Sequence, residues 1–221
     1  MSTGQLPDFD AAYGGEAVLP GAARVPWNIG EPQPPIAALI EAGRVHGTVL
    51  DAGCGIGETA LHLAGRGHSV VGLDLSPNAI GQARARAAGL GLDVEFAVAD
   101  ITSFTGYDGR FDTVIDSTLF HSIPVAGRSG YLASIARAAA PGATLHILVF
   151  SREAPFPDDV RPNLVDEVEL RESVAEHWTV ESLAPSSITA ILPEALGGGH
   201  PRDDRGRFRL PAYLLSASLP G

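Results

Sequence analysis

Cysteine, lysine and long hydrophobic runs are all scarce or absent in this 221-residue sequence. The single cysteine, Cys54, excludes an internal disulfide. No apolar run approaches the ~18 residues that a membrane-spanning helix requires, so we expect no contact with a membrane. Met1 to Asp10 shows neither the basic segment nor the apolar core of a secretory signal. We therefore expect a cytoplasmic protein.

Basic side chains are scarce as well. The sequence has 26 acidic residues against 15 basic ones, all arginine, which gives a formal net charge of −11. An acidic surface repels the phosphate backbone of nucleic acids, so a small molecule is the expected substrate. No histidine and carboxylate stand at a helical ligand spacing in the predicted strand-end loops, so we expect no metal site. A monomer and a homodimer both remain open.

Apolar segments alternate with segments of helical pattern along most of the chain. Continuous apolar strands between helices are typical of a parallel sheet buried on both faces, so we predict a single α/β domain with residues 36–221 as its core. Its strands are expected at residues 48–51, 69–74, 94–97, 112–115 and 144–150, then at 179–183 or 188–191, and at 210–216. Its helices are expected at residues 35–43, 58–66, 77–88, 128–139 (stopped by Pro141 and Gly142) and 168–176.

Residues 1–35 do not fit the sheet pattern. They are rich in proline and glycine, and a loop of this length in a compact domain is usually a functional lid or disordered. Its aromatic residues, among them Phe9, Tyr13 and Trp27, argue against disorder. We expect this segment to form a lid, with a short helix at residues 7–13.

The most informative stretch runs from Val49 to Gly57 and reads Val-Leu-Asp-Ala-Gly-Cys-Gly-Ile-Gly. It predicts a short strand, a turn with three glycines at alternate positions, and a helix from Glu58. Such a turn lets a ligand lie against the main chain, where the amides of the helix N-terminus face it. The glycine pattern alone also occurs in nicotinamide and flavin enzymes and as a purely structural turn.

Two acidic residues narrow the choice of ligand. Asp51 stands two residues before Gly53, where a carboxylate would repel a pyrophosphate but suits an ammonium group. Asp74 follows Gly57 by 17 positions and ends the second predicted strand. An acidic residue at that place holds a ribose diol in doubly wound folds.

The stretch from Leu50 to Gly57 resembles the first motif of the class I S-adenosylmethionine-dependent methyltransferases. The resemblance implies a Rossmann-like seven-stranded sheet, mostly parallel with an antiparallel last strand, helices on both faces, and S-adenosylmethionine as cofactor. It implies that Asp51 and the glycine turn hold the methionine end, Asp74 the ribose, and Asp100 with Ile101 the adenine. The expected cofactor-binding residues are Trp27, Gly30, Asp51, Gly53, Gly55, Gly57, Asp74, Leu75, Asp100, Ile101 and Asp116.

Four aspartates, Asp51, Asp74, Asp100 and Asp116, stand at or just after the ends of the first four predicted strands. Ligands in open α/β sheets bind beyond the carboxyl ends of the strands, so we expect these side chains on one rim. Asp116 is expected both to bind the cofactor and to take part in catalysis. Asp100 has an alternative role, as the cap of the following turn.

The loop after the fourth strand, Asp116 to Pro124, contains the expected catalytic histidine. In class I methyltransferases this loop lies beside the methyl group and the acceptor. Imidazole is suited to proton transfer near neutral pH, so we expect His121 to be the general base; the alternative is a wall residue or a structural hydrogen-bonding residue. The acceptor is expected to contact Phe9, Tyr13, Phe120, His121 and Phe150.

The stretch from Trp27 to Pro34, which reads Trp-Asn-Ile-Gly-Glu-Pro-Gln-Pro, gives a second resemblance. It is similar to the Trp-x-x-Gly stretch of the thiopurine and thiol methyltransferases and of related bacterial enzymes that methylate small heterocycles and quinone-like compounds. It implies that Trp27 covers the cofactor, whereas packing on the first helix is the alternative. We predict S-adenosylmethionine-dependent methyl transfer to an oxygen, sulfur or nitrogen atom of a small aromatic or heteroaromatic acceptor. The alternatives are a thiol or quinone methyltransferase, an NAD-dependent oxidoreductase and a cofactor-binding module without catalysis.

Overall fold

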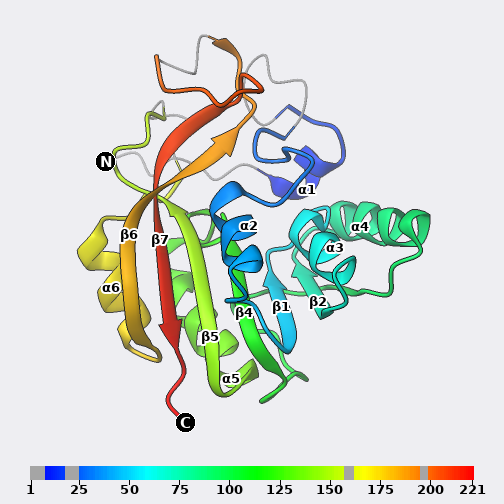
Figure 1. The fold of residues 1–221 in the computed structure, drawn as a ribbon, viewed down its shortest axis with the longest axis vertical. Coiled ribbons are helices and arrows are strands. Elements are labelled where there is room, and N and C mark those ends of the chain that lie inside the picture. The colour runs from blue at the N-terminus through cyan, green and yellow to red at the C-terminus, as the bar shows by residue number, and fades with distance from the viewer. Residues whose placement is uncertain (1–7, 18–24, 157–161, 195–198) are drawn as a thin grey trace.

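A computed structural model describes residues 8–17, 25–156, 162–194 and 199–221. Within these ranges seven strands form one sheet in the order β3-β2-β1-β4-β5-β7-β6 (Figure 1). β1 to β5 pair in parallel, and β7 runs antiparallel to both β5 and β6, so the predicted α/β fold is confirmed. The strands are β1 (Thr48–Ala52), β2 (Ser69–Asp74), β3 (Glu95–Val98), β4 (Phe111–Ser117), β5 (Ala139–Phe150), β6 (Thr179–Ala190) and β7 (Phe208–Ser218).

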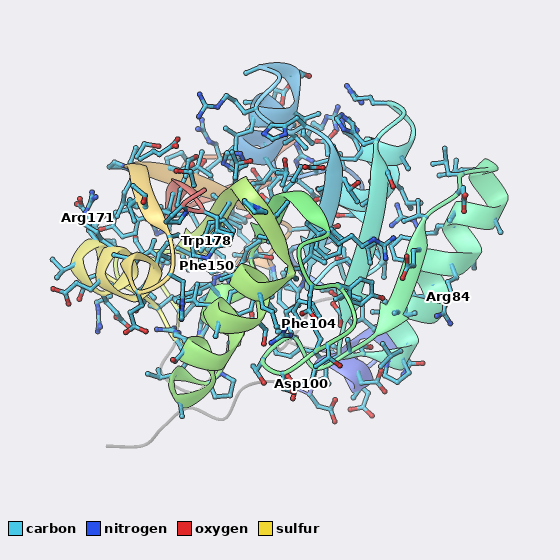
Figure 2. The ribbon with its side chains drawn as sticks, turned by 90° about the horizontal axis from the view of Figure 1, so that it is seen from below. Arg84, Asp100, Phe104, Phe150, Arg171 and Trp178 are labelled. Carbon is cyan, nitrogen blue, oxygen red and sulfur yellow. The ribbon has the colours of Figure 1, made fainter. Side chains whose placement is uncertain are left out.

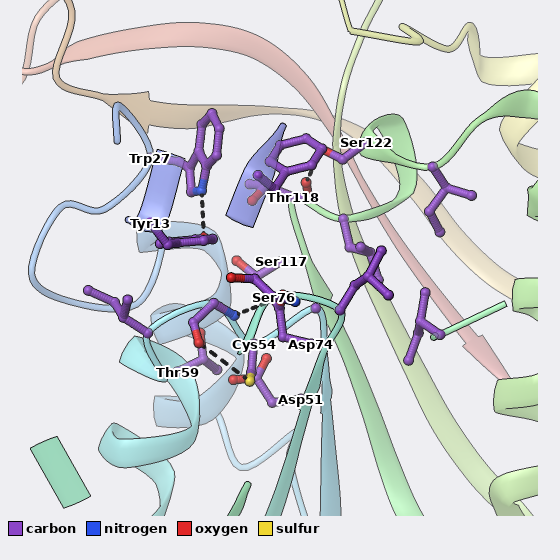
Figure 3. Close-up of a pocket in the computed structure, with 18 of the residues that line it drawn as sticks. Tyr13, Trp27, Asp51, Cys54, Thr59, Asp74, Ser76, Ser117, Thr118 and Ser122 are labelled. Atoms are coloured by element: carbon purple, nitrogen blue, oxygen red, sulfur yellow. Dashed lines mark hydrogen bonds between the residues drawn. The ribbon is translucent and has the colours of Figure 1, made fainter. Parts of the chain in front are cut away.

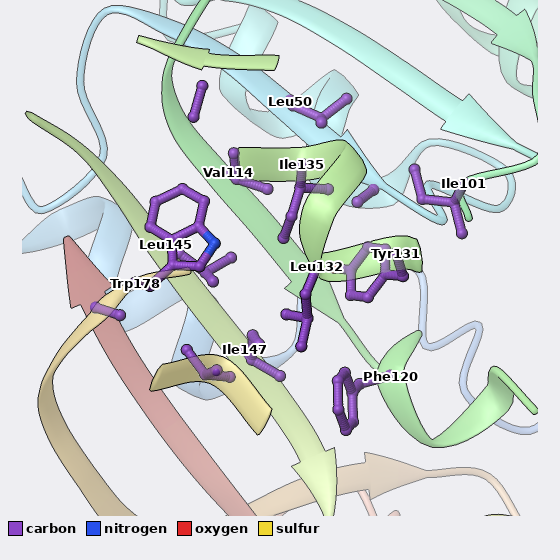
Figure 4. Packing of buried hydrophobic residues seen from close by; sticks show 14 of the residues in the cluster. Leu50, Ile101, Val114, Phe120, Tyr131, Leu132, Ile135, Leu145, Ile147 and Trp178 are labelled. Atoms are coloured by element: carbon purple, nitrogen blue, oxygen red, sulfur yellow. The ribbon is translucent and has the colours of Figure 1, made fainter. Parts of the chain in front are cut away.

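Helices cover both faces of the sheet, and each face has its own core because successive strand residues point to opposite sides. Val49 packs into the cluster of α2, α3 and α4, whereas Leu50 packs into the cluster of α5 and α6 (Figure 4). Phe150 and Trp178 lie inside the molecule in Figure 2. The helices are α1 (Phe9–Tyr13), α2 (Pro34–Glu41), α3 (Glu58–Ala64), α4 (Pro77–Leu90), α5 (Arg128–Ala138) and α6 (Glu167–Ala175), with short 3₁₀ turns at Phe120–Ser122 and Val125–Gly127.

Local sequence signals set the start and end of α4. The hydroxyl of Ser76 accepts a hydrogen bond from the amide of Ala79, and Pro77 occupies the first turn. The helix ends at Gly91, whose φ of 66° is in the left-handed region, so it runs two residues further than predicted. None of the helices in the described residues is long and apolar enough to cross a membrane.

Two predicted boundaries are wrong. The two alternatives for the sixth strand are parts of one strand, β6, whose continuity was hidden by Pro185; proline is tolerated there because β6 is an edge strand. β5 begins at Ala139 directly after α5, so Pro141 and Gly142 lie within the strand and do not stop the helix. The β4–β5 pairing shifts register between Phe111 and Thr113, which accommodates a proline that has no N–H to donate.

Candidate functional site

A cavity of about 570 Å³ lies at the carboxyl ends of β3, β2, β1 and β4 (Figure 3). Its lining follows the strand order: Asp100 and Ile101 after β3, Asp74 and Leu75 at β2, Asp51 and Gly53 at β1, and the residues that follow β4. A volume in the range of about 300–1,000 Å³ is typical of small-molecule sites. Four of the strands therefore build one elongated site.

The cavity is strongly acidic. The described lining contains no arginine, lysine or histidine, and no cluster in the described residues is arranged to hold a metal ion. Such a wall favours a ligand that carries positive charge or several hydrogen-bond donors. Its seven carboxylates belong to Asp8, Asp10, Glu31, Asp51, Glu58, Asp74 and Asp100.

The glycine turn, residues 53–57, forms the floor at β1. Gly53 and Gly55 line the cavity, and Gly55 has a φ of 53°; a Cβ there would lie 2.6 Å from the Tyr13 hydroxyl. Gly57 does not line the cavity, and a Cβ at Gly57 would lie 2.8 Å from the ring of Phe96. Gly57 therefore lets α3 and β3 pack together and does not contact a ligand in the cavity.

Asp51 and Asp74 stand side by side in the cavity wall. The Asp51 carboxylate accepts a hydrogen bond from the amide of Ala60 (3.0 Å) in α3, and burial raises its pKa to about 7. The Asp74 carboxylate accepts from the amides of Gly55 (2.8 Å) and Ser76 (2.9 Å), and burial raises its pKa as well. Each oxygen can accept a second bond, so both groups can still receive donors from a ligand.

Asp100 caps the turn that follows it and also lines the cavity. One oxygen accepts hydrogen bonds from the amide (2.9 Å) and the hydroxyl (2.7 Å) of Thr102, which caps the turn and lowers the pKa of Asp100. The same side chain lines the cavity beside Ile101 and the exposed Leu75. This end of the site offers an ionised carboxylate next to apolar surface.

Asp116 does not line the cavity. It pairs with Ala52 in the sheet, on the face opposite to Asp51, and it is fully buried. Its carboxylate accepts bonds from the Tyr131 hydroxyl (2.8 Å) and the amides of Leu119 (2.8 Å) and Phe120 (3.2 Å). The expected cofactor-binding and catalytic roles of Asp116 do not fit this position. Asp116 instead fixes the β4 loop, residues 117–124.

His121 also lies outside the cavity. It is 4% exposed, and its Nδ1 accepts a hydrogen bond from the amide of Phe150 (3.2 Å), which leaves the ring proton on Nε2. Burial, with a contribution from Arg128, lowers the pKa of His121 to about 3. A histidine with no free lone pair and so low a pKa is a poor general base, so the expected role does not fit. Phe120 and Phe150 likewise pack in the core (Figure 4 shows Phe120).

The aromatic residues of α1 and its following segment close the cavity. The Trp27 indole donates to the Tyr13 hydroxyl (3.2 Å; Figure 3). The Phe9 ring meets the Trp27 ring edge-to-face, with 5.9 Å between the ring centroids. Asp10 seats α1 on α4 by accepting bonds from the Ser76 hydroxyl (2.5 Å) and the amide of Asn78 (3.0 Å). Phe9, Tyr13 and Trp27 all line the cavity, as expected of a lid.

Residues 25–33, here termed the strap, continue this cover. Gly30 lies outside the cavity and donates its amide to Glu58 of α3 (2.8 Å). The Gln33 side chain is buried and pairs with the main chain of Thr189 in β6, donating to its carbonyl (2.9 Å) and accepting from its amide (2.8 Å). Glu31 forms ion pairs with Arg205 (3.1 Å) and Arg207 (2.7 Å). The strap is thus tied to α3, β6 and the segment before β7.

Several polar lining residues were missed by the sequence analysis. The loop after β4 was selected for its histidine, yet the hydroxyl-bearing residues around it face the cavity. The stretch from Trp27 to Pro34 was used only for its Trp-x-x-Gly pattern, so the carboxylate and the amide that follow this pattern in the strap were not selected. The missed residues are Asp8, Asp10, Asn28, Glu31, Gln33, Glu58, Thr59, Ser76, Thr102, Ser117, Thr118 and Ser122.

Comparison with known proteins identifies the family. Residues 49–142, which contain the glycine turn and all four strand-end aspartates, match the family described as "Methyltransferase domain". The chain is 58% identical over 216 residues to a 2-heptyl-1-hydroxyquinolin-4(1H)-one methyltransferase of Mycobacteroides abscessus, and the match covers 95% of each protein. The chain belongs to the S-adenosylmethionine-dependent methyltransferases.

Solved structures of other proteins share the fold of this methyltransferase. One, described under "Conversion of a Disulfide Bond into a Thioacetal Group during Echinomycin Biosynthesis", is 40% identical, with a TM-score of 0.83 over 96% of this chain and 91% of the other. Another is a Burkholderia thailandensis 1,6-didemethyltoxoflavin-N1-methyltransferase with bound S-adenosylhomocysteine; it is 24% identical, with a TM-score of 0.61 over 85% of this chain and 78% of the other. The latter likeness concerns the fold alone.

Proposed function

We propose that this methyltransferase methylates a hydroxyl oxygen on a small heteroaromatic acceptor of the hydroxyquinolone class. One observation carries the proposal: a single acidic cavity crosses four strand ends and is closed by three aromatic side chains, Phe9, Tyr13 and Trp27. The 58% identity to a hydroxyquinolone methyltransferase, extending over 95% of both chains, supports the acceptor class. Flat aromatic rings pack favourably against such aromatic walls.

The cavity fits S-adenosylmethionine through the chemistry of its donors. The ammonium, the ribose diol and the adenine amine of the cofactor are hydrogen-bond donors, and the wall offers Asp51, Asp74 and Asp100 in that strand order. We assign Asp51 with Gly53 and Gly55 to the methionine end, Asp74 to the ribose, and Asp100 with Ile101 and Leu75 to the adenine. This order leaves the end of β4 for the acceptor.

Alignment is the main contribution of the chain to the reaction. When bound, S-adenosylmethionine would supply the methyl group of its sulfonium: a bond from the acceptor oxygen to the methyl carbon forms in line as the carbon–sulfur bond breaks, and S-adenosylhomocysteine is the leaving group. The carboxylates orient the cofactor, while Tyr13 and Trp27 exclude water above the glycine turn. Correct positioning of two reactants lowers the activation barrier by about 7–11 kcal/mol. A general base typically accelerates a reaction ~10²–10⁴-fold, which corresponds to a smaller lowering of the barrier.

The acidity of the acceptor hydroxyl makes a histidine base unnecessary. Because His121 has no free lone pair towards the cavity, the acceptor proton must leave to solvent or to a wall carboxylate such as Glu31. A hydroxyl on a heteroaromatic ring is acidic enough to ionise in part near neutral pH. An aliphatic alcohol is not, so the cavity favours the former.

Acceptor turnover tests the proposal. The purified protein is incubated with S-adenosylmethionine and 2-heptyl-1-hydroxyquinolin-4(1H)-one, and S-adenosylhomocysteine and the methylated product are followed by mass spectrometry. 2-Heptylquinolin-4(1H)-one, which lacks only the N-hydroxyl, is the matched control substrate. We expect turnover of the hydroxyl compound and at most slow turnover of the control. Faster methylation of thiols or quinols in a parallel panel would refute the hydroxyquinolone class as the acceptor. Tight cofactor binding without any turnover would indicate a cofactor-binding module without catalysis.

We also propose a cytoplasmic, single-domain protein, present as a monomer or a homodimer, in which residues 1–35 act as the lid; residues 1–7 and 18–24 of this segment lie outside the described residues. The buried free thiol of Cys54 suits a reducing compartment. The net charge of −11 disfavours nucleic acid as a partner. Size-exclusion chromatography with light scattering measures the oligomeric state.

A further inference from the structure

Thr118, in the β4 loop, has an unusual backbone conformation. Its φ is 77°, and no other residue except glycine has a positive φ among the residues that the structure describes. Threonine is β-branched, and its side chain crowds the main chain in this left-handed region. Outliers of this kind persist only where the surroundings impose them, and they concentrate at functional sites.

The surroundings of Thr118 do impose the conformation. Its amide donates to the carbonyl of Leu148 in β5 (2.9 Å), and its carbonyl accepts from the Ser122 hydroxyl (3.3 Å). The buried Asp116 carboxylate holds the next two amides, those of Leu119 and Phe120. Hydrogen bonds before, at and after Thr118 therefore turn the chain away from the direction of β4.

The turn brings polar side chains to the acceptor end of the cavity. Ser117, Thr118 and Ser122 all line it, and Figure 3 shows Thr118 and Ser122 across the cavity from Tyr13 and Trp27. The Leu119 side chain packs on Gly53, where a Cβ would lie 2.7 Å away, so the turn is also seated on the floor of the cofactor site. A shift of this turn would move the acceptor wall relative to the cofactor.

We propose that Thr118 is a positioning residue for the acceptor, held in a strained backbone so that its side chain and that of Ser117 contact the polar edge of the acceptor. The proposal rests on the proposed function, because it needs an acceptor at the end of β4. A hydroxyl on a strained turn orients a heteroaromatic oxygen or nitrogen by one hydrogen bond. An extended backbone at this position would not place both side chains on the same wall.

Three substitutions separate strain, shape and hydrogen bonding. Thr118→Gly relieves the strain and removes the side chain, Thr118→Val keeps the shape without the hydroxyl, and Thr118→Ser keeps the hydroxyl. For each variant we would measure the melting temperature, the Kd for S-adenosylhomocysteine by calorimetry, and kcat and KM for the acceptor. The acceptor is whichever compound the wild type methylates fastest, so that rejection of hydroxyquinolones would refute the proposed function without deciding this inference.

For Thr118→Gly we expect an unchanged or higher melting temperature and an unchanged cofactor Kd, because the strain is relieved and no cofactor contact is lost. Its kcat/KM for the acceptor should fall about 10- to 100-fold, the effect of a misplaced reactant. Thr118→Ser should restore most of this loss, and Thr118→Val should not. The inference is overturned if Thr118→Gly matches the wild type in kcat/KM, or if its loss of activity accompanies a lower melting temperature and weaker cofactor binding, as for a merely structural residue.

Discussion

The pKa of Asp51 predicts that cofactor binding depends on pH. Burial, together with the nearby carboxylates of Asp74 and Asp116, raises this pKa to about 7. The ammonium of the cofactor binds the ionised carboxylate, so the complex holds fewer protons than the free protein and the affinity rises with pH. If Asp51 kept the ordinary aspartate pKa of about 3.9, it would be ionised throughout this range and the affinity would not change with pH near neutrality.

The size of the effect follows from the ionised fraction. With a pKa of about 7, roughly a tenth of Asp51 is ionised at about pH 6 and roughly nine tenths at about pH 8. If only the ionised form binds the ammonium, the Kd for S-adenosylhomocysteine should fall about tenfold between these pH values, or ~1.4 kcal/mol. Isothermal titration in buffers of different ionisation enthalpy should detect release of close to one proton at the lower pH and almost none at the higher pH.

Two variants make this test specific. Asp51→Asn can still accept the hydrogen bond of the Ala60 amide but cannot ionise, so it should bind more weakly at about pH 8 and show no pH dependence. Asp100→Asn is the matched control: the pKa of Asp100 is lowered by its bonds to Thr102, so its loss should weaken binding equally at both pH values. A flat profile in the wild type, or an unchanged slope in Asp51→Asn, would refute the reasoning.

Two further predictions concern the strap and the buried histidine. Gln33→Ala leaves the amide and carbonyl of Thr189 unpaired in a buried place, so the free energy of unfolding should fall by about 2–5 kcal/mol in chemical denaturation; equal stability would show that water replaces the side chain. Gln33→Glu keeps only an acceptor and should regain stability on acidification, when its carboxyl group can donate again. His121→Ala should lower stability by about 1–3 kcal/mol, because the Phe150 amide loses its acceptor. Its kcat per folded molecule should change less than about tenfold, and a loss of ~10²-fold or more would restore the general-base assignment.

The strand-end motifs could be predicted from sequence because they depend on local chemistry. The glycine turn needs left-handed backbone, Ser76 and Pro77 start a helix, and the acidic residues close apolar runs. These features were enough to predict the order of elements and the fold, and to place three acidic residues at the same edge of the sheet. Asp51, Asp74 and Asp100 are accordingly found in one cavity wall.

The face on which a strand-end residue points could not be predicted in the same way. Asp51 pairs with Ile115 and Ala52 with Asp116, so a difference of one residue in register sends Asp116 to the opposite face of the sheet. There it bonds to Tyr131 of α5, a contact that depends on tertiary packing. The position of the His121 side chain could not be predicted for a related reason. The three residues of a 3₁₀ turn point in different directions, and the contact with Phe150 sets the direction of the His121 ring.

The placement of β7 between β5 and β6 affects the order in which the protein can be completed during synthesis. β6 pairs with β7 and with no other strand of the described sheet, so Thr189 has no fixed position until residues 208–218 have been made. Gln33 is synthesised much earlier than Thr189, so its hydrogen bonds to the main chain of Thr189 cannot form before then. A nascent chain can form the glycine turn and the neighbouring parallel strands while its strap is still unanchored. The cofactor cleft of the growing polypeptide therefore remains open to solvent until the last strand is inserted.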